Sequence, residues 1–130
     1  MKFYHLNAPG PLYTNTFLII SEAGHGVIID ACADAKKYLT LLQENSASLV
    51  AILQTHGHFD HVGAIEPLKK ATGARVYMNA ADQKQFGIKA DEDLTDGQIV
   101  TVDELTFTVI TTPGHTPGSV CIRMGDELFT

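Results

Sequence analysis

Apolar and polar positions alternate along the chain in short blocks, which predicts many brief strands and a few helices. Apolar, β-branched runs bounded by turn residues are typical of strands, whereas apolar residues that recur every three or four positions indicate helices. We expect strands over residues 12–20, 26–29, 48–54, 74–78, 98–101, 105–111 and 126–130, with further strands at the start of the chain and around Cys121.

The helical pattern covers residues 34–44, 62–71 and 80–86. In the first of these helices Asp34 is a suitable N-cap, and Tyr38 and Leu42 share the face expected to lie on the sheet. Residues 91–97 are acidic, and we interpret them as a solvated loop rather than as a metal site. No repeat and no change in composition marks a boundary, so the chain is expected to form one domain.

The segment of residues 55–61, Thr-His-Gly-His-Phe-Asp-His, is the most specific chemical signal in the chain. It lies between a predicted strand and a predicted helix, and its side chains are good ligands for zinc or iron. Residues i and i+2 of an extended backbone point the same way, so His56 and His58 can bind one ion together. Asp60 and His61 follow where the chain turns, and we expect them to point to a second position nearby.

A second loop, residues 111–119, contains His115 between Pro113 and Pro117. It lies where a predicted strand ends. A structural zinc site uses four protein ligands, whereas a catalytic site keeps one position open for water. His115 would complete a three-histidine set with His56 and His58 and would leave that position open.

These two segments resemble the metallo-β-lactamase superfamily. Residues 55–61 match its THxHxDH signature, and residues 112–119 match the TPGHTPGS loop of its glyoxalase II-like branch. The resemblance implies an α/β fold in which residues 1–130 form a single partial domain. That domain would be the N-terminal part of an αββα sandwich, a mixed, mostly antiparallel sheet with flanking helices. The implied ligands are His56, His58 and His115 for a first metal and Asp60 and His61 for a second.

In this branch a strand like residues 126–130 is normally followed by Gly-Asp, whose aspartate bridges the two metals, and later by a further histidine. Neither ligand lies within the chain, so we expect one firmly bound ion, a weak second site and weak or no turnover by these residues alone. We also expect the inner sheet face, including residues 27–29 and 105–110, to be uncovered. That face, or the edge of the final strand, would then favour a homodimer.

Composition limits the function classes. The chain has 130 residues and a net charge of −6 without a basic run, which argues against binding to nucleic acid. No apolar stretch approaches the roughly 18 residues that span a membrane, and the start leads into a strand rather than a signal peptide. Cys32 and Cys121 are far apart, so we expect no disulfide and a cytoplasmic location. His5 and His25 are expected to be a strand residue and a turn residue without a metal role.

Two further residues are candidates for supporting the metal ligands. Asp30 ends a predicted buried strand, and such a carboxylate can accept a hydrogen bond from the loop or from a ligating histidine. The alternative is an ordinary residue of a strand-end turn. Thr55 could tie the His56 loop through its hydroxyl, although its preference for strands explains its position equally well.

The function implied by the resemblance is metal-dependent hydrolysis of a small-molecule thioester, with hydroxyacylglutathione as the model substrate. The metal would activate water, and Asp60 would orient the hydroxide and take part in proton transfer. Zinc is the expected metal, in one or two ions, and the same ligands suit iron or manganese. Two alternatives remain open: an iron-dependent redox member, such as a persulfide dioxygenase or a flavodiiron-like protein, and an inactive metal-binding half-domain. No substrate-binding residue can be identified.

Overall fold

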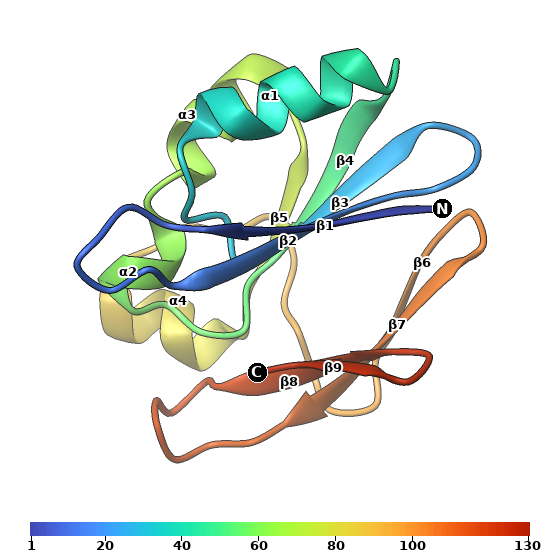
Figure 1. The fold of residues 1–130 in the computed structure, drawn as a ribbon. Helices are drawn as coiled ribbons and strands as arrows, with labels where there is room; N and C mark the ends of the chain where they lie inside the picture. The colour runs from blue at the N-terminus through green and yellow to red at the C-terminus, as the bar shows by residue number, and fades with distance from the viewer.

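Two β-sheets packed face to face form the centre of the computed structural model, which describes residues 1–130 (Figure 1). The first sheet has the order β1-β2-β3-β4-β5 and contains β1 (Lys2–Asn7), β2 (Asn15–Ile20), β3 (His25–Ile29), β4 (Ser48–Leu53) and β5 (Arg75–Tyr77). Its first three strands pair antiparallel, and β3, β4 and β5 pair parallel. The parallel pairs follow from the helical crossovers between these strands.

The second sheet is an antiparallel meander that faces the first. It contains β6 (Ile99–Val102), β7 (Leu105–Thr111), β8 (Val120–Met124) and β9 (Glu127–Phe129), which pair in chain order. Strand β9 pairs only with β8 and so forms one edge of this sheet. The predicted mixed and mostly antiparallel arrangement is confirmed.

The helices are α1 (Ala35–Glu44), α2 (Phe59–Val62), α3 (Ile65–Thr72) and α4 (Ala80–Phe86). Helices α1 and α3 cover the outer face of the first sheet (Figure 1). Asp34 caps α1 by accepting a hydrogen bond from the backbone N–H of Lys36, and Tyr38 and Leu42 are buried, as predicted. None of the helices has the length and apolar character that crossing a membrane requires.

The predicted helix over residues 62–71 is confirmed as α3 from residue 65 onward, but its predicted start is wrong. The segment forms two helices, α2 and α3, with a break at Gly63 and Ala64. The backbone N–H of Ala64 donates to the carbonyl of Ala31 at 2.8 Å instead of continuing the helical ladder. This bond joins the start of α3 to the loop after β3. The short α2 therefore belongs to the histidine loop, and α3 belongs to the outer helical layer.

The core has two layers, because alternate residues of a strand point to opposite faces. Leu18, Ile28 and Ile52 pack under α1 and α3. Ile19 and Val27 point the other way and pack between the two sheets against Phe107. The first sheet is therefore buried on both faces, which is typical of strands that read as continuous apolar runs.

The expectation that the inner sheet face is uncovered is wrong. Val27, Ile29, Leu105, Phe107 and Val109 are all buried, because residues 99–129 supply a second sheet that covers the first. Within the second sheet, the large apolar side chains that remain exposed lie on the outer face, which no helix of the structure covers. They include Ile99, Ile110 and Leu128.

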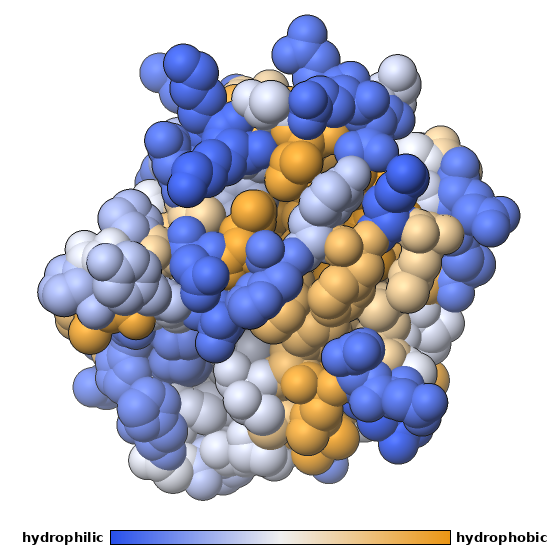
Figure 2. All heavy atoms as spheres, viewed as in Figure 1, coloured by the Kyte–Doolittle hydropathy of each residue, from blue (hydrophilic) through white to orange (hydrophobic).

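Aromatic side chains close one open side of the sandwich. The ring of Phe129 lies 4.9 Å from that of Phe17 and 6.2 Å from that of Phe3, measured between ring centroids. Figure 2 shows the corresponding apolar strip on the surface where β1 and β2 face β9. The contact joins the edge strands of the two sheets along this side.

Candidate metal centre

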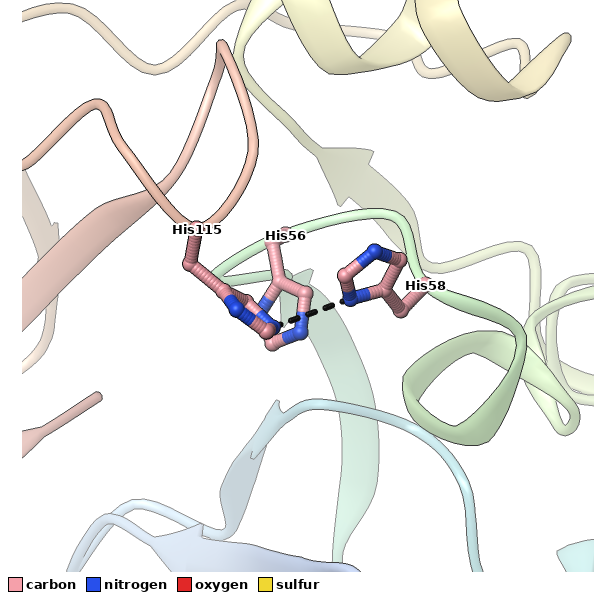
Figure 3. A group of neighbouring side chains, drawn as sticks. All are labelled: His56, His58 and His115. Carbon is pink, nitrogen blue, oxygen red and sulfur yellow. Dashed lines mark hydrogen bonds between the residues drawn. The ribbon is translucent and has the colours of Figure 1, made fainter.

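Three histidines converge from two loops that leave different sheets. His56 and His58 lie in the loop between β4 and α2, and His115 lies in the loop between β7 and β8 (Figure 3). One ligand nitrogen from each lies within 4.8 Å of the other two. Nδ1 of His58 and Nε2 of His115 are 3.0 Å apart. Two nitrogens bound to one tetrahedral zinc would be about 3.3 Å apart, so the spacing suits a shared ion.

The tautomer of His56 is fixed by a chain of hydrogen bonds. The Thr55 hydroxyl lies 2.6 Å from Oδ2 of Asp30 and donates to it, because an ionised carboxylate only accepts. That hydroxyl then accepts from the Nδ1–H of His56 at 3.0 Å. Nε2 of His56 therefore carries a lone pair rather than a proton.

That lone pair has no partner in the protein. Nε2 of His56 is the buried side-chain nitrogen without a hydrogen bond, and the residue is only 7% exposed. Burial, together with the neighbouring His61, lowers the pKa of His56 from its ordinary 6.5 to about 4. An unpaired, neutral and buried imidazole nitrogen next to two other imidazoles fits a zinc ligand, and all three donors are types that zinc prefers.

A second pair of side chains adjoins this group. Nδ1 of His61 donates to Oδ2 of Asp30 at 2.8 Å, and the rings of His56 and His61 lie 3.8 Å apart. Burial lowers the pKa of His61, but the hydrogen bond and charge of Asp30 and the charge of Asp60 outweigh burial and raise it. Because Nδ1 of His61 bonds Asp30, its Nε2 points away from Asp30 and toward Asp60.

Asp60 lies beside His61 rather than among the clustered ligand atoms. Its Oδ2 is 3.5 Å from Nε2 of His61 and accepts a hydrogen bond from the Thr14 hydroxyl at 2.9 Å. Burial raises the pKa of Asp60. The Thr14 hydrogen bond and the neighbouring His61 lower this pKa by more than burial raises it, so the pKa lies below its ordinary value. Asp60 is thus held as an anion at the rim of the site.

Asp30 contacts the ligand loop at three points. Besides the Thr55 hydroxyl and His61, it accepts the backbone N–H of Thr55 at 2.7 Å through Oδ1. Asp30 is buried and has a positive φ of 55°, which places its side chain under the loop. It reaches His56 only through Thr55. Asp30 with His56 and His61 also forms a cluster of potential ligand atoms, but the oxygens of Asp30 already accept these three hydrogen bonds.

Two supporting residues were missed from the sequence. Gln54 accepts the backbone N–H of Ala31 and donates to the backbone carbonyl of His61 at 2.7 Å. Since Gln54 directly follows β4, the second bond ties the end of the histidine loop to the strand from which the loop leaves. Asp82 on α4 is fully buried and accepts hydrogen bonds from both histidine loops. An acidic residue in the first turn of a helix is usually a surface residue that interacts favourably with the helix dipole, so no sequence pattern indicated this contact.

Two hollows open on either side of His61. One, of about 360 Å³, is lined by His56, His61, Thr112, His115, Ser119, Val120, Cys121 and Thr130. The other, of about 470 Å³, is lined by the β1–β2 loop, by the ends of β3 and β9, and by Asp30 and His61. The histidine cluster is therefore open to a small molecule from one end of the sandwich.

The remaining histidines and the cysteines lie outside the ligand cluster. His5 hydrogen-bonds Asn15, and His25 hydrogen-bonds Asp103 at the opposite end of the sheets. Both cysteines are free thiols. Burial first, and then the charges of Asp30 and Asp60, raise the pKa of Cys32 to about 12, which makes it a poor metal ligand and nucleophile.

Comparison with known proteins gives a consistent result. Residues 9–129 match the model of the metallo-beta-lactamase superfamily. The chain is 33% identical over 122 residues to PksB of Bacillus subtilis, a probable polyketide biosynthesis zinc-dependent hydrolase, covering 91% of this chain and 54% of PksB. It is 42% identical over 106 residues to the hydroxyacylglutathione hydrolase of Ectopseudomonas mendocina, covering 74% of this chain and 40% of that enzyme.

The crystal structure of ETHE1 from Myxococcus xanthus superposes with a TM-score of 0.85 at 31% identity, covering 98% of this chain and 56% of that one. The chain thus spans about half the length of the proteins it matches. In this chain the two histidine loops lie at one end of two packed sheets. The chain belongs to the metallo-β-lactamase superfamily, a superfamily of metal-dependent hydrolases.

Proposed function

We propose that residues 1–130 carry the first metal site of a zinc-dependent hydrolase that cleaves thioesters of the hydroxyacylglutathione type. The observation that carries the proposal is the convergence of His56, His58 and His115, with Nε2 of His56 buried and without a partner. Three imidazole ligands that leave one coordination position open are the arrangement used by catalytic rather than structural zinc.

Bound zinc would supply a nucleophilic hydroxide near neutral pH and would polarise the substrate carbonyl. The protein's part is to hold the ligands in the correct tautomer. Thr55 and Asp30 do this for His56, and Asp30 does it for His61. Such partners raise the basicity of a ligating imidazole and fix the direction in which its lone pair points.

Asp60 is the candidate for proton handling and for orienting the attacking water. The Thr14 hydroxyl and His61 fix one of its oxygens, and its lowered pKa keeps it ionised at neutral pH. A carboxylate in this state accepts a hydrogen bond from water and can take a proton transiently. We assign Asp60 a role in orienting the nucleophile and in transient proton transfer, and it remains ionised between these transfers.

The thioester assignment is supported by the relatives and by the shape of the site. Several hydroxyacylglutathione hydrolases are 33–42% identical to the chain, and PksB is described as a probable polyketide biosynthesis zinc-dependent hydrolase. The hollow beside His56 and His115 opens to solvent and can admit a carbonyl group carried on a larger thiol.

The test is zinc-dependent cleavage of S-lactoylglutathione, followed by the appearance of free thiol. We expect slow cleavage, in line with the weak turnover expected of these residues alone, and we expect that a chelator stops it, that added zinc restores it and that His58→Ala removes it. His25→Ala is the matched control, because His25 lies at the other end of the sheets. Zinc-loaded protein that cleaves no thioester above the buffer rate, or a rate that the chelator leaves unchanged, would contradict the proposal.

A further inference from the structure

Asp82 is a buried carboxylate outside both histidine motifs on which three donors converge. Its Oδ2 accepts the backbone N–H of Gly57 and the hydroxyl of Thr116, both at 2.8 Å. Its Oδ1 accepts the backbone N–H of Gly118 at 2.7 Å. The residue is 0% exposed, so these bonds replace all contact with water. A buried carboxylate is stable only when its oxygens are satisfied in this way.

The three donors belong to the two loops that carry the metal ligands. Gly57 lies between His56 and His58 in the loop from the first sheet. Thr116 follows His115 in the loop from the second sheet. Asp82 therefore joins, through one side chain, the backbone N–H between His56 and His58 to the hydroxyl of the residue after His115 and to the backbone N–H of Gly118.

Besides the contact between the His58 and His115 rings, a backbone hydrogen bond joins the two loops, from the N–H of Val120 to the carbonyl of Thr55 at 2.8 Å. It lies at the start of the first loop, before His56. Asp82 bonds the first loop after His56, at Gly57, and the second loop at Thr116 and Gly118. With both links in place neither loop can rotate about a single contact, which fixes the distance between their histidines.

Helix α4 is also packed closely on both loops. A Cβ atom added at Gly57 would lie 2.5 Å from the Phe86 ring, and one added at Gly118 would lie 2.6 Å from the backbone N of Asp82. Phe86 is four residues from Asp82, on the same face of the helix, and its ring meets that of His58 edge to face at 5.2 Å. Glycine at both positions lets α4 approach the loops closely enough for Asp82 to bond them.

We propose that Asp82 is a positioning residue that fixes the two histidine loops relative to each other, and so sets the zinc affinity of the His56, His58 and His115 site. The proposal rests on the zinc site of the proposed function. Asp82 does not touch the ligand nitrogens; it acts through the backbone of Gly57 and Gly118 and through Thr116. Groups that orient ligands in this way typically contribute about ten- to hundredfold in metal affinity.

The test is the zinc affinity of Asp82→Asn, measured by competition with a chromophoric chelator. Asparagine keeps the size of the side chain but places an NH2 group where one carboxylate oxygen accepted, so either the Gly118 bond or the Gly57 and Thr116 bonds are lost. We expect zinc to bind about ten- to hundredfold more weakly. We also expect the visible absorption of the cobalt-substituted protein to change, because the arrangement of the ligands is altered. Thr116→Val, which removes one donor, is a milder second variant and should weaken zinc binding less.

Asp93→Asn is the matched control. Asp93 accepts the N–H of Ala80 at 2.8 Å at the start of the same helix, but it touches neither loop. Both bonds end at Oδ1, which asparagine keeps as an acceptor, so this variant should keep wild-type stability, zinc affinity and cobalt spectrum. The inference is wrong if Asp82→Asn and Thr116→Val bind zinc as tightly as the wild type, or if Asp93→Asn weakens zinc binding equally. If the wild-type protein itself binds no zinc, it is the proposed function that fails.

Discussion

The two ends of the sandwich each contain a histidine hydrogen-bonded to an aspartate, and they differ mainly in burial. At the metal end, Nδ1 of His61 lies 2.8 Å from Asp30, and the two side chains are 15% and 4% exposed. At the opposite end, Nδ1 of His25 lies 2.6 Å from Asp103, and the side chains are 43% and 32% exposed. The same pairing thus occurs in a dry and in a wet environment.

The difference in surroundings gives the pairs different consequences. Asp103 also accepts a hydrogen bond from the Ser21 hydroxyl. Together with the His25 bond, this contact joins the β2–β3 turn to the β6–β7 turn at the surface. Asp30 holds a ligand loop, and its histidine partner lies against His56. Surface ion pairs contribute little to stability, whereas breaking a buried pair leaves an unsatisfied charge. The pair at the metal end is therefore expected to matter for both folding and zinc binding.

The largest effect should come from Asp30→Asn. The change replaces one carboxylate oxygen of Asp30 with an NH2 group, which cannot accept a hydrogen bond. At least one of the buried donors, the Thr55 N–H, the Thr55 hydroxyl or the His61 ring, then loses its acceptor. We expect the free energy of unfolding to fall by about 3 kcal/mol and zinc binding to weaken sharply. Chemical denaturation and zinc titration measure the two effects. Unchanged values for both would show that the buried pair has no more influence than the exposed one.

A smaller effect should appear in the pH dependence of the metal-free protein. The folded pKa of His56 is about 4, below its ordinary 6.5, so the folded state disfavours its protonation. The stability that His56 contributes is present above pH 6.5 and is lost as the pH falls from about 6.5 to about 4. Urea denaturation of chelator-treated protein across this range should show a decline.

The decline should be shallower in His56→Gln and unchanged in His25→Gln. Comparing the two variants separates the buried histidine from the carboxylates, which also titrate in acid. Equal slopes for His56→Gln and the wild type would contradict the assigned burial of this imidazole.

The smallest effect should come from Asp103→Asn. Asp103 is at the surface, where the Ser21 and His25 hydrogen bonds that lower its pKa compete with water. We expect a melting temperature close to that of the wild type and unaltered zinc binding. A loss of stability as large as that of Asp30→Asn would show that burial does not distinguish the two pairs.

Local signals in the sequence predicted most of the elements and the positions of the ligand candidates. The histidine loops lie at strand ends, as the apolar runs around them indicated, and Asp34 caps α1. These features depend on neighbours in the chain, so their residue patterns are informative.

Features that depend on distant segments were not predicted. Asp82 bonds residues 25 to 36 positions away, and its own helix gives no hint of them. Strand β3 is covered by β7, which lies about 80 positions away in the chain, and the inner face was wrongly expected to be uncovered because no local pattern indicates that contact. The break before α3 likewise depends on a hydrogen bond to Ala31, on another loop.

The zinc content of the purified chain tests the central claim most directly. After dialysis against metal-free buffer, elemental analysis should find close to one zinc per chain in the wild type and in His25→Ala. It should find almost none in His56→Ala or His115→Ala, because each removes one of the three converging nitrogens. Wild-type protein without zinc, or zinc retained in full by the His56 and His115 variants, would contradict the account.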